Sequence, residues 1–220
     1  MNGRLIVIEG LDGSGKATQA DLLFTHLHDM LGDNVRKVSF PDYESPSSGP
    51  LKMYLNGEMG SSAGDVNAYA ASTLFAVDRL ASFRSDWGKL YNSGGTIIAD
   101  RYTTSNAVHQ CSKLPESQWD EFLEWLFDFE YRLLEIPAPD KVIYLRVDPD
   151  TSQQLLSKRY SNDESKKDIH ERDQEYLRRS RIAADHCAKT LGWKVVECVR
   201  DGKLRSIEDI AAEIRSILLN

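Results

Sequence analysis

The stretch from Ile8 to Gln19, IEGLDGSGKATQ, limits the possible folds more than any other part of the sequence. Gly10, Gly15 and Lys16 satisfy the pattern G-x-x-x-x-G-K, and Gly13 lies between them. An apolar run before Gly10 predicts a strand, and the apolar spacing after Lys16 predicts a helix. Backbone N–H groups and the helix dipole then converge on an anion. The stretch therefore predicts a phosphate-binding loop rather than an ordinary glycine turn.

The rest of the chain continues this alternation of strands and helices. Short, nearly continuous apolar runs suit strands that are covered on both faces. The segments between them carry apolar residues at three- and four-residue steps, which is typical of helices. We therefore expect an α/β fold, a P-loop three-layer α/β/α sandwich with a central five-stranded parallel sheet. The predicted strands are residues 4–10, 35–40, 96–100 and 141–148, with a weaker one near Lys194, and the predicted helices include residues 17–31, 121–134 and, capped by Ser206 and Asp209, 206–219.

Composition narrows the class of protein. A chain of 220 residues with 41% hydrophobic residues can bury one sizeable core, so we expect a single domain over residues 1–220. A net charge of -7 argues against a nucleic-acid polymer as partner, because such a partner needs a basic face. Three scattered cysteines fit neither a disulfide framework nor a zinc site. The short apolar run at the amino terminus suits neither a signal peptide nor a membrane span, so we expect a cytoplasmic protein.

One segment, residues 157–172, interrupts the α/β pattern. Its sequence, SKRYSNDESKKDIHER, is almost devoid of apolar residues and carries many charges of both signs. A solvated helix surface or loop is one interpretation of such a composition. The other is a mobile lid that brings cations to a bound substrate, and we expect a lid at about 157–172.

The lysine of the glycine loop is followed by an alanine. Lys16 is expected to reach the β- and γ-phosphates of a nucleoside triphosphate. Ala17 offers no hydroxyl to Mg²⁺, and Thr18 points about 100° further round a helix. Any metal must then be held by phosphate oxygens, waters and a carboxylate, for which Asp100 at the end of TIIAD is the candidate, through water. An Asp that only begins a turn is the alternative. The predicted ATP-binding residues are Gly10, Gly13, Ser14, Gly15, Lys16, Ala17 and Thr18.

Four motifs together resemble the thymidylate kinase family. They are GLDGSGKATQ in the glycine loop, FPDY at residues 40–43, FAVDR at residues 75–79 and DRYTTSNAVHQ at residues 100–110. Their order and spacing are those of the family, and the charged segment falls where the family has its lid. The resemblance implies a nucleoside monophosphate kinase that transfers the γ-phosphate of ATP to dTMP, giving dTDP, with Mg²⁺ as cofactor and a homodimeric assembly.

The resemblance also assigns roles to individual residues. Arg101 resembles the arginine that grips the acceptor phosphate, for which a planar guanidinium is suited. Phe75 resembles the aromatic that stacks on thymine, and Arg79 the arginine that hydrogen-bonds a base carbonyl. Gln110 lies where the family places a side chain against the base edge. The implied dTMP-binding residues are Asp12, Phe40, Pro41, Phe75, Arg79, Arg101, Ser105, His109 and Gln110, and the implied catalytic residues are Lys16, Arg101, Arg159 and Asp12.

Three positions depart from the family pattern. Tyr43 and Gly13 stand where many or some relatives carry an arginine, so the cations needed in the transition state are expected from the lid. The lid offers Lys158, Arg159, Lys166, Lys167 and Arg172, and Arg159 is the preferred candidate. His109 stands where relatives often have an aromatic near the sugar. It is disfavoured as a catalytic base because an ionised acceptor phosphate has no proton to lose. Glu9, just before the loop, is interpreted as structural.

Alternatives remain at this point. A kinase for another nucleoside monophosphate or a deoxynucleoside is kept open by Tyr43 and His109. A nucleotide-dependent switch without metabolic turnover is the more distant alternative, and no guanine-reading N-K-x-D sequence supports it. Residues 65–91 can form one extended helix with apolar residues on more than one face. Its outer face meets either a twofold partner or the chain's own core.

Overall fold

The structure is a computed structural model that describes residues 3–62, 64–148, 151–152, 155 and 174–219. The segment 157–172, predicted as a lid, lies outside the described residues, and so does Arg159.

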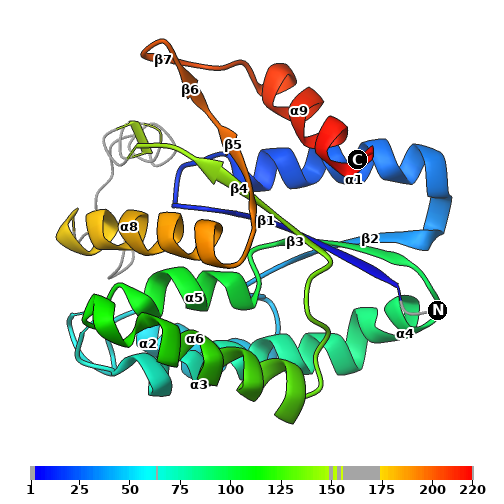
Figure 1. The fold of residues 1–220 in the computed structure, drawn as a ribbon. Helices are drawn as coiled ribbons and strands as arrows, with labels where there is room; N and C mark the ends of the chain where they lie inside the picture. The colour runs from blue at the N-terminus through cyan, green and yellow to red at the C-terminus, as the bar shows by residue number, and fades with distance from the viewer. Residues whose placement is uncertain (1–2, 63, 149–150, 153–154, 156–173, 220) are drawn as a thin grey trace.

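A five-stranded parallel sheet forms the centre of the molecule, as the sequence predicts (Figure 1). Its strands lie in the order β2-β3-β1-β4-β5 and run parallel throughout. Their bounds are β1 Arg4–Gly10, β2 Val35–Ser39, β3 Thr96–Asp100, β4 Lys141–Arg146 and β5 Lys194–Glu197. In the register Ile8 of β1 pairs with Asp100 of β3, so the carboxyl ends of these two strands lie side by side. Loops that follow parallel strands at such an edge form the usual binding crevice of this fold class.

Two layers of helices cover the sheet because its strands are apolar on both faces. In β1, Leu5 and Val7 pack into one core, whereas Ile6 and Ile8 pack into another. The second core is closed by α1 (Lys16–Leu31) and α9 (Ile207–Leu219), which lie together on one side of the sheet in Figure 1. The first is closed on the opposite side by α3 (Ala68–Ser82), α5 (Thr103–Cys111), α6 (Trp119–Phe127) and α8 (Gln174–Thr190). The predicted three-layer α/β/α sandwich is confirmed.

The helices of the larger layer include two π-helical turns. The predicted helix over residues 65–91 begins at α3, where the Asn67 side chain accepts a hydrogen bond from the Ala70 N–H. The predicted helix over residues 121–134 continues from α6 into the π-helical segment η5. Bounds are α2 Gly49–Leu55, α3 Ala68–Ser82, η3 Phe83–Trp87, α4 Gly88–Asn92, α5 Thr103–Cys111, α6 Trp119–Phe127, η5 Asp128–Leu133 and α8 Gln174–Thr190, with short 3₁₀ turns η1 Gly32–Asn34, η2 Pro46–Ser48 and η4 Glu116–Gln118.

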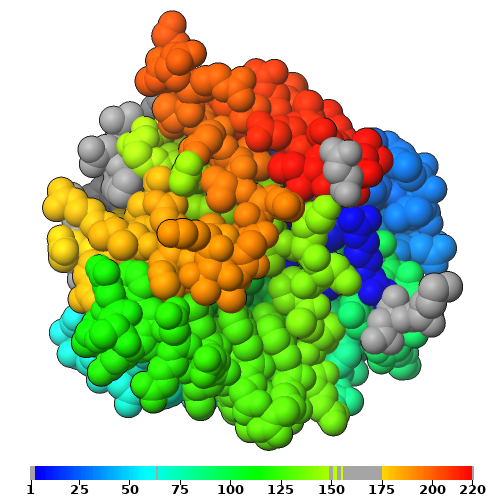
Figure 2. Space-filling model, in the orientation of Figure 1, coloured from blue at the N-terminus to red at the C-terminus, as the bar shows by residue number. Residues whose placement is uncertain are grey.

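A small antiparallel hairpin stands apart from the main sheet. Its strands are β6 (Val199–Arg200) and β7 (Lys203–Leu204), and Figure 2 shows the hairpin projecting from the surface near α9. The carboxyl-terminal helix α9 follows, and the Ser206 hydroxyl caps it by accepting from the Asp209 N–H at 3.1 Å. Among the described residues, no helix combines the length and the apolar character needed to cross a membrane.

Candidate active site

One cavity of about 780 Å³ opens at the carboxyl ends of β1 and β3. It is lined by the glycine loop, by the loops after β2 and β3, and by side chains of α3 and α5. Of the predicted site residues that the structure describes, all but Gly10 and Ser14 line it. Those residues are Asp12, Gly13, Gly15, Lys16, Ala17, Thr18, Phe40, Pro41, Phe75, Arg79, Asp100, Arg101, Ser105, His109 and Gln110. The fold thus brings four separate sequence motifs to one place.

The glycine loop is shaped by close packing at its start and by open space at its end. A Cβ on Gly10 would lie 2.6 Å from the Ser14 Oγ and 2.9 Å from the Leu145 carbonyl oxygen, so no larger residue fits there. Gly15 precedes α1 with a φ of 86°, and no atom of another described residue, apart from its two chain neighbours, lies within 4 Å of where its Cβ would be. A left-handed glycine with free space at a helix N-terminus is the arrangement in which backbone N–H groups reach a phosphate.

Lys16 is the first residue of α1 and its side chain is buried. Its Nζ donates to the Leu11 carbonyl oxygen at 2.8 Å and lies 3.8 Å from the Asp12 carboxylate. Burial, with Arg101 nearby, lowers the pKa of Lys16 to about 8, although the surrounding carboxylates raise it. The ammonium is therefore held in the cavity with little solvation, ready to gain from an anionic ligand.

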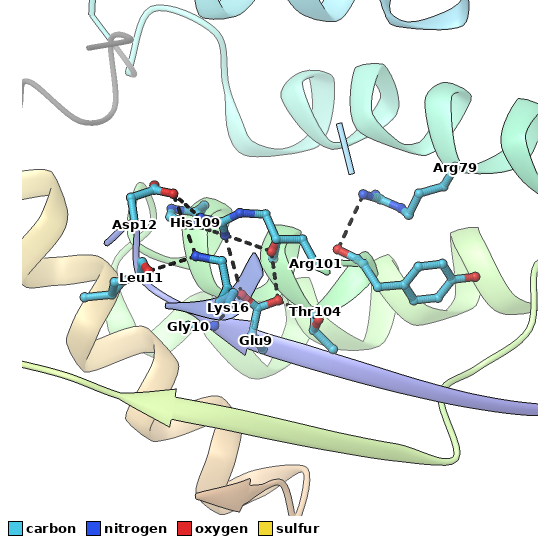
Figure 3. Close-up of polar contacts among 11 residues, drawn as sticks. Glu9, Gly10, Leu11, Asp12, Lys16, Arg79, Arg101, Thr104 and His109 are labelled. Carbon is cyan, nitrogen blue, oxygen red and sulfur yellow. Dashed lines mark hydrogen bonds and ion pairs between the residues drawn. The ribbon is translucent and has the colours of Figure 1, made fainter. Parts of the chain in front are cut away.

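Arg101 is the centre of a polar cluster beside the glycine loop (Figure 3). Its Nη2 pairs with the Asp12 carboxylate, and its Nη1 donates to the Ser105 Oγ at 3.1 Å and the His109 Nε2 at 3.2 Å. The Glu9 carboxylate lies 3.5 Å from the same Nη1. Arg101 also has a φ of 66°, a backbone conformation that is uncommon outside glycine and concentrates at functional sites.

Glu9 organises the floor of this cluster from a fully buried position. Its carboxylate accepts from the Thr104 hydroxyl at 2.7 Å, the Ser105 hydroxyl at 2.8 Å and the Gly10 N–H at 2.9 Å. These contacts join β1 to the start of α5. Burial raises the pKa of Asp12, but Arg101, Lys16 and His109 outweigh it and hold that pKa well below its usual range. Asp12 is therefore an acceptor of hydrogen bonds at neutral pH and not a proton donor.

Carboxylates outnumber cations around the glycine loop. Among the described residues, the carboxylates of Glu9, Asp12 and Asp100 surround the two fixed cations Lys16 and Arg101. A nucleoside triphosphate adds several negative charges, so its binding here calls for further cations.

Asp100 is the described residue that best fits a role toward a hydrated metal. It ends β3, lines the cavity, and its Oδ1 is buried without a hydrogen-bond partner among the described residues. Ala17 and Thr18 are exposed and line the same cavity. In the described part of the chain, no group of three or more His, Cys, Asp or Glu side chains is arranged to hold a metal ion directly. The donors present suit a metal held through water and phosphate oxygens.

The far end of the cavity is built by α3 and α5. Phe75 is half-buried and meets Tyr54 edge to face, with ring centroids 6.3 Å apart. Arg79, one turn later, is 1% exposed and still lines the cavity. Figure 3 shows it entering from α3, well away from the cluster at the glycine loop. The Gln110 side chain is fully buried and neither amide atom has a partner among the described residues. An aromatic face and amide groups at this end suit a flat heteroaromatic ligand.

Phe40 and Pro41 lie between the two ends and are joined by a cis peptide bond. The loop that follows them is fastened to α3 through Asp78, whose carboxylate accepts from the Asp42 N–H and the Ser47 hydroxyl, both at 2.8 Å. This explains why the FPDY and FAVDR motifs share one cavity.

His109 of α5 is packed against the neighbouring helix α8. It stacks on Tyr176, with ring centroids 5.9 Å apart and an interplanar angle of 18°.

Several residues of the site carry no signal that single-sequence reasoning recognised. Asn106 and Leu55 line the cavity, and Asp78 secures one of its loops. Glu130 in η5 is fully buried and accepts two hydrogen bonds from the Arg79 guanidinium, from Nε at 2.7 Å and from Nη2 at 2.5 Å. A helical period places Asn106 on the same face of α5 as Gln110, which was the available signal for it. Glu130 lies in an apolar, aromatic stretch where nothing distinguishes it from a surface acid.

The sequence as a whole matches proteins of known class. Residues 8–214 match the family model described as thymidylate kinase. The thymidylate kinase of Mycobacterium tuberculosis (strain H37Rv) is 32% identical over 197 residues, which cover 87% of this chain and 90% of that protein. The thymidylate kinase of Schizosaccharomyces pombe is 31% identical over 147 residues, covering 67% of this chain and 62% of that protein.

Solved structures give the same result at the level of the fold. The structure of thymidylate kinase from Candida albicans has a TM-score of 0.69 over 99% of this chain and 92% of that chain, at 22% identity. The thymidylate kinase structure from Ehrlichia chaffeensis has a TM-score of 0.69 over 99% of this chain and 100% of that chain, at 20% identity. Likeness at this level of identity bears on the fold alone.

Proposed function

We infer how the substrates bind from the premise that this chain belongs to the thymidylate kinase family and is a dTMP kinase, a phosphotransferase with a P-loop. One observation carries the proposed arrangement. A single cavity has Lys16 and the glycine loop at one end, Phe75 and Arg79 at the other, and Arg101 between them. We propose that the phosphates of ATP occupy the first end, that the base of dTMP occupies the second, and that the acceptor phosphate lies by Arg101.

At the donor end the chain supplies positioning and positive charge. The N–H groups of Gly13, Gly15, Lys16, Ala17 and Thr18 face the phosphates, and the Lys16 ammonium contacts the β- and γ-phosphates. The Ser14 N–H is taken up inside the loop, where it donates to the Leu11 carbonyl oxygen at 3.1 Å. Gly10 and Ser14 line no part of the cavity and act by shaping the loop. Transfer of a phosphoryl group needs little covalent chemistry from a protein, so the rate follows from alignment and from charge stabilisation at the reacting oxygens.

At the acceptor end each predicted residue has a defined task. Phe75 stacks on the thymine ring, and Arg79 and Gln110 contact its edge, where a guanidinium offers donors only and an amide offers both kinds of group. Arg101 binds the 5′-phosphate of dTMP, and Asp12 helps to orient that guanidinium. Phe40, Pro41, Ser105 and His109 enclose the sugar and phosphate, and His109 helps to hold the Arg101 guanidinium through its Nε2, 3.2 Å from Nη1, rather than removing a proton.

Mg²⁺ is the proposed cofactor. Asp100 would hold it through water, and the phosphate oxygens would supply the remaining ligands. When bound, the ion would neutralise charge on the phosphates. The cations of the lid at about 157–172, Arg159 foremost, are proposed to supply the rest of the charge; the segment lies outside the described residues, so this rests on the sequence.

A homodimer in the cytoplasm is the proposed state of the protein. On the layer of helices that includes α3 and η5, Val77 is 53% exposed and Leu133 is 58% exposed, which leaves apolar surface for a second copy of the chain. All three cysteines, Cys111, Cys187 and Cys198, are free and buried, which suits a reducing compartment. Light scattering on the purified protein tests the assembly, and a mass of one chain would contradict it.

The experiment that tests the function is ADP production from ATP and Mg²⁺ with single acceptors. The acceptors dTMP, dUMP, dCMP, dGMP, UMP and thymidine are offered separately at equal concentration. We expect turnover largely confined to dTMP. Turnover with another acceptor but not dTMP would keep the phosphate site and overturn the roles given to Phe75, Arg79 and Gln110.

A further inference from the structure

Glu130 is a buried acid at the far end of the cavity that no sequence motif marks. It belongs to the π-helical segment η5 and is 0% exposed. Besides Arg79 it accepts from the Thr103 hydroxyl at 2.7 Å and from the Asn106 Nδ2 at 3.3 Å. One carboxylate therefore joins side chains from α3 and from two positions of α5. Arg79 and Asn106 also line the cavity.

The contacts of Arg79 leave one of its three guanidinium nitrogens for a ligand. Nε and Nη2 both donate to Glu130, in the paired geometry that fits a guanidinium to a carboxylate. The contact found for Nη1 is a long one, 3.5 Å to the Tyr102 carbonyl oxygen, drawn in Figure 3. Because a guanidinium only donates, Nη1 suits a carbonyl oxygen and not an amino group.

Charge gives a second reason for the pairing. The Arg79 and Glu130 side chains are 2% and 0% exposed, so either charge alone would be buried without a counterion. A buried pair tolerates this only when the remaining donors and acceptors are satisfied. Glu130 meets that condition with hydrogen bonds from three residues. Because Glu130 neutralises Arg79, this end of the cavity has no net charge. It still offers a hydrogen-bond donor of fixed direction to an uncharged ring.

We propose that Glu130 is the positioning residue of the base-binding end: it fixes the Arg79 guanidinium, with Asn106, so that Nη1 faces a carbonyl oxygen of the acceptor base. The inference rests on the proposed role of Arg79. Glu130 does not touch the substrate, and it acts through Arg79. It sets the affinity for dTMP and the preference for a carbonyl over an amino group, and it has no part at the phosphate end.

Glu130→Gln tests this with the least change of shape. Glutamine has one acceptor oxygen, so it cannot reproduce the paired geometry in which Nε and Nη2 each donate to a separate oxygen, and its amide nitrogen faces a donor. We expect the KM for dTMP to rise about tenfold or more, the loss of one hydrogen bond to a charged group, with the KM for ATP unchanged. The ratio of kcat/KM for dTMP to that for dCMP falls as well. Asp128→Asn is the matched control, because Asp128 lies in the same segment but pairs with Arg132 at the surface.

A double-mutant cycle separates positioning from a purely structural role. Arg79→Met raises the KM for dTMP, and adding Glu130→Gln to it should change that KM little further, because Glu130 acts through Arg79. Additive effects on the KM would overturn the inference. If Glu130→Gln has a normal KM and Arg79→Met has a raised KM, the inference on Glu130 is overturned but the proposed role of Arg79 stands. A normal KM in Arg79→Met would overturn the proposed role of Arg79 as well.

Folding of the variants is checked by circular dichroism and thermal melting. If Glu130→Gln does not fold, Glu130→Asp keeps the charge but is one methylene too short to hold both guanidinium nitrogens. We then expect a raised KM for dTMP with an unchanged KM for ATP. Equal losses for both substrates would show a structural role only and would overturn the inference.

Discussion

The two ends of the cavity are built in opposite ways. At the glycine loop, the groups proposed to bind phosphate come from one continuous stretch, residues 10–18, and most of them are backbone N–H groups. At the base end they come from α3, α5 and η5, which lie far apart in sequence. The first end holds the poorly solvated Lys16 ammonium among carboxylates, whereas the second holds a closed ion pair, Arg79 with Glu130.

The difference shows how one fold separates catalysis from recognition. The phosphate end needs charge that responds to a ligand, and it keeps Lys16 with a pKa lowered to about 8. The proposed base end needs donors at fixed positions, and there Arg79 is neutralised by Glu130, so in our proposal the direction of the donor, and not its charge, distinguishes one base from another. Changes at the first end should therefore affect kcat, and changes at the second should affect the KM for dTMP.

The largest expected effect is at the phosphate end. Lys16→Met removes the cation that contacts the transferring group, and we expect kcat to fall about 10²- to 10³-fold. The KM for dTMP should change little. Lys37→Met is the control, because Lys37 pairs with Asp21 at the surface. Steady-state kinetics with both substrates varied measures this, and a fall in kcat no greater than in the control would break the division between the two ends.

The mirror experiment is Phe75→Leu at the base end. Stacking of a base on an aromatic side chain contributes about 1–3 kcal/mol, so the KM for dTMP should rise roughly tenfold. The KM for ATP and the kcat should remain near those of the parent protein. An equal rise in the KM for ATP would mean that the two ends do not recognise different substrates.

Asp100→Asn examines the metal at the phosphate end. If Asp100 orients a hydrated Mg²⁺, the concentration of Mg²⁺ that gives half-maximal rate should rise about tenfold, the usual effect of an outer-sphere ligand. The KM for dTMP serves as the internal control. An unchanged Mg²⁺ dependence would assign the free Oδ1 of Asp100 to the turn that follows β3.

Binding of ATP should depend on pH through Lys16. The pKa of the free protein's Lys16 lies at about 8, and bound phosphate raises it, so binding above pH 8 takes up a proton. The dissociation constant for ATP should then rise by up to about tenfold per pH unit above pH 8. Titration calorimetry in buffers of different ionisation enthalpy detects the proton uptake. Lys16→Arg should flatten the profile, and binding of dTMP should show no such dependence on this group.

The last prediction concerns stability and not catalysis, at the wall behind Phe75. Lys113 donates to the Tyr54 hydroxyl at 2.7 Å and to the Val66 carbonyl oxygen at 3.2 Å, and burial lowers its pKa to about 7. The unfolded chain, with an ordinary lysine pKa of 10.5, keeps the proton to higher pH. The stability of the parent protein relative to Lys113→Met should therefore rise between pH 7 and pH 9, at most about 1.4 kcal/mol per pH unit. Urea unfolding across this range measures it, and a constant difference would contradict the assignment.

The sequence was sufficient for the sheet because its strands are apolar on both faces and alternate with helices. The phosphate end could also be predicted from the sequence, because its strand, loop and helix are consecutive. Its glycines are required by the backbone conformation of the loop. Arg101 and Phe75 were found through short motifs. The structure places the glycine loop, Arg101 and Phe75 around one cavity.

The base end shows where such reasoning stops. Glu130 and Asp78 act through contacts across 51 and 36 positions of the chain. Contacts over such a sequence separation leave no periodic pattern in the sequence. Glu130, within an aromatic helix, therefore could not be distinguished from an acid at the surface. Only the packing of η5 against α3 and α5 brings Glu130 to Arg79.

A crystal structure of the complex with dTMP would test the central claim most directly. The account predicts the thymine ring against Phe75, one of its carbonyl oxygens within hydrogen-bond distance of the Arg79 Nη1, and the 5′-phosphate at Arg101. The Arg79–Glu130 pair should remain intact in that complex. A base bound at the glycine loop, or an Arg79 that leaves Glu130 to reach the ligand, would contradict it.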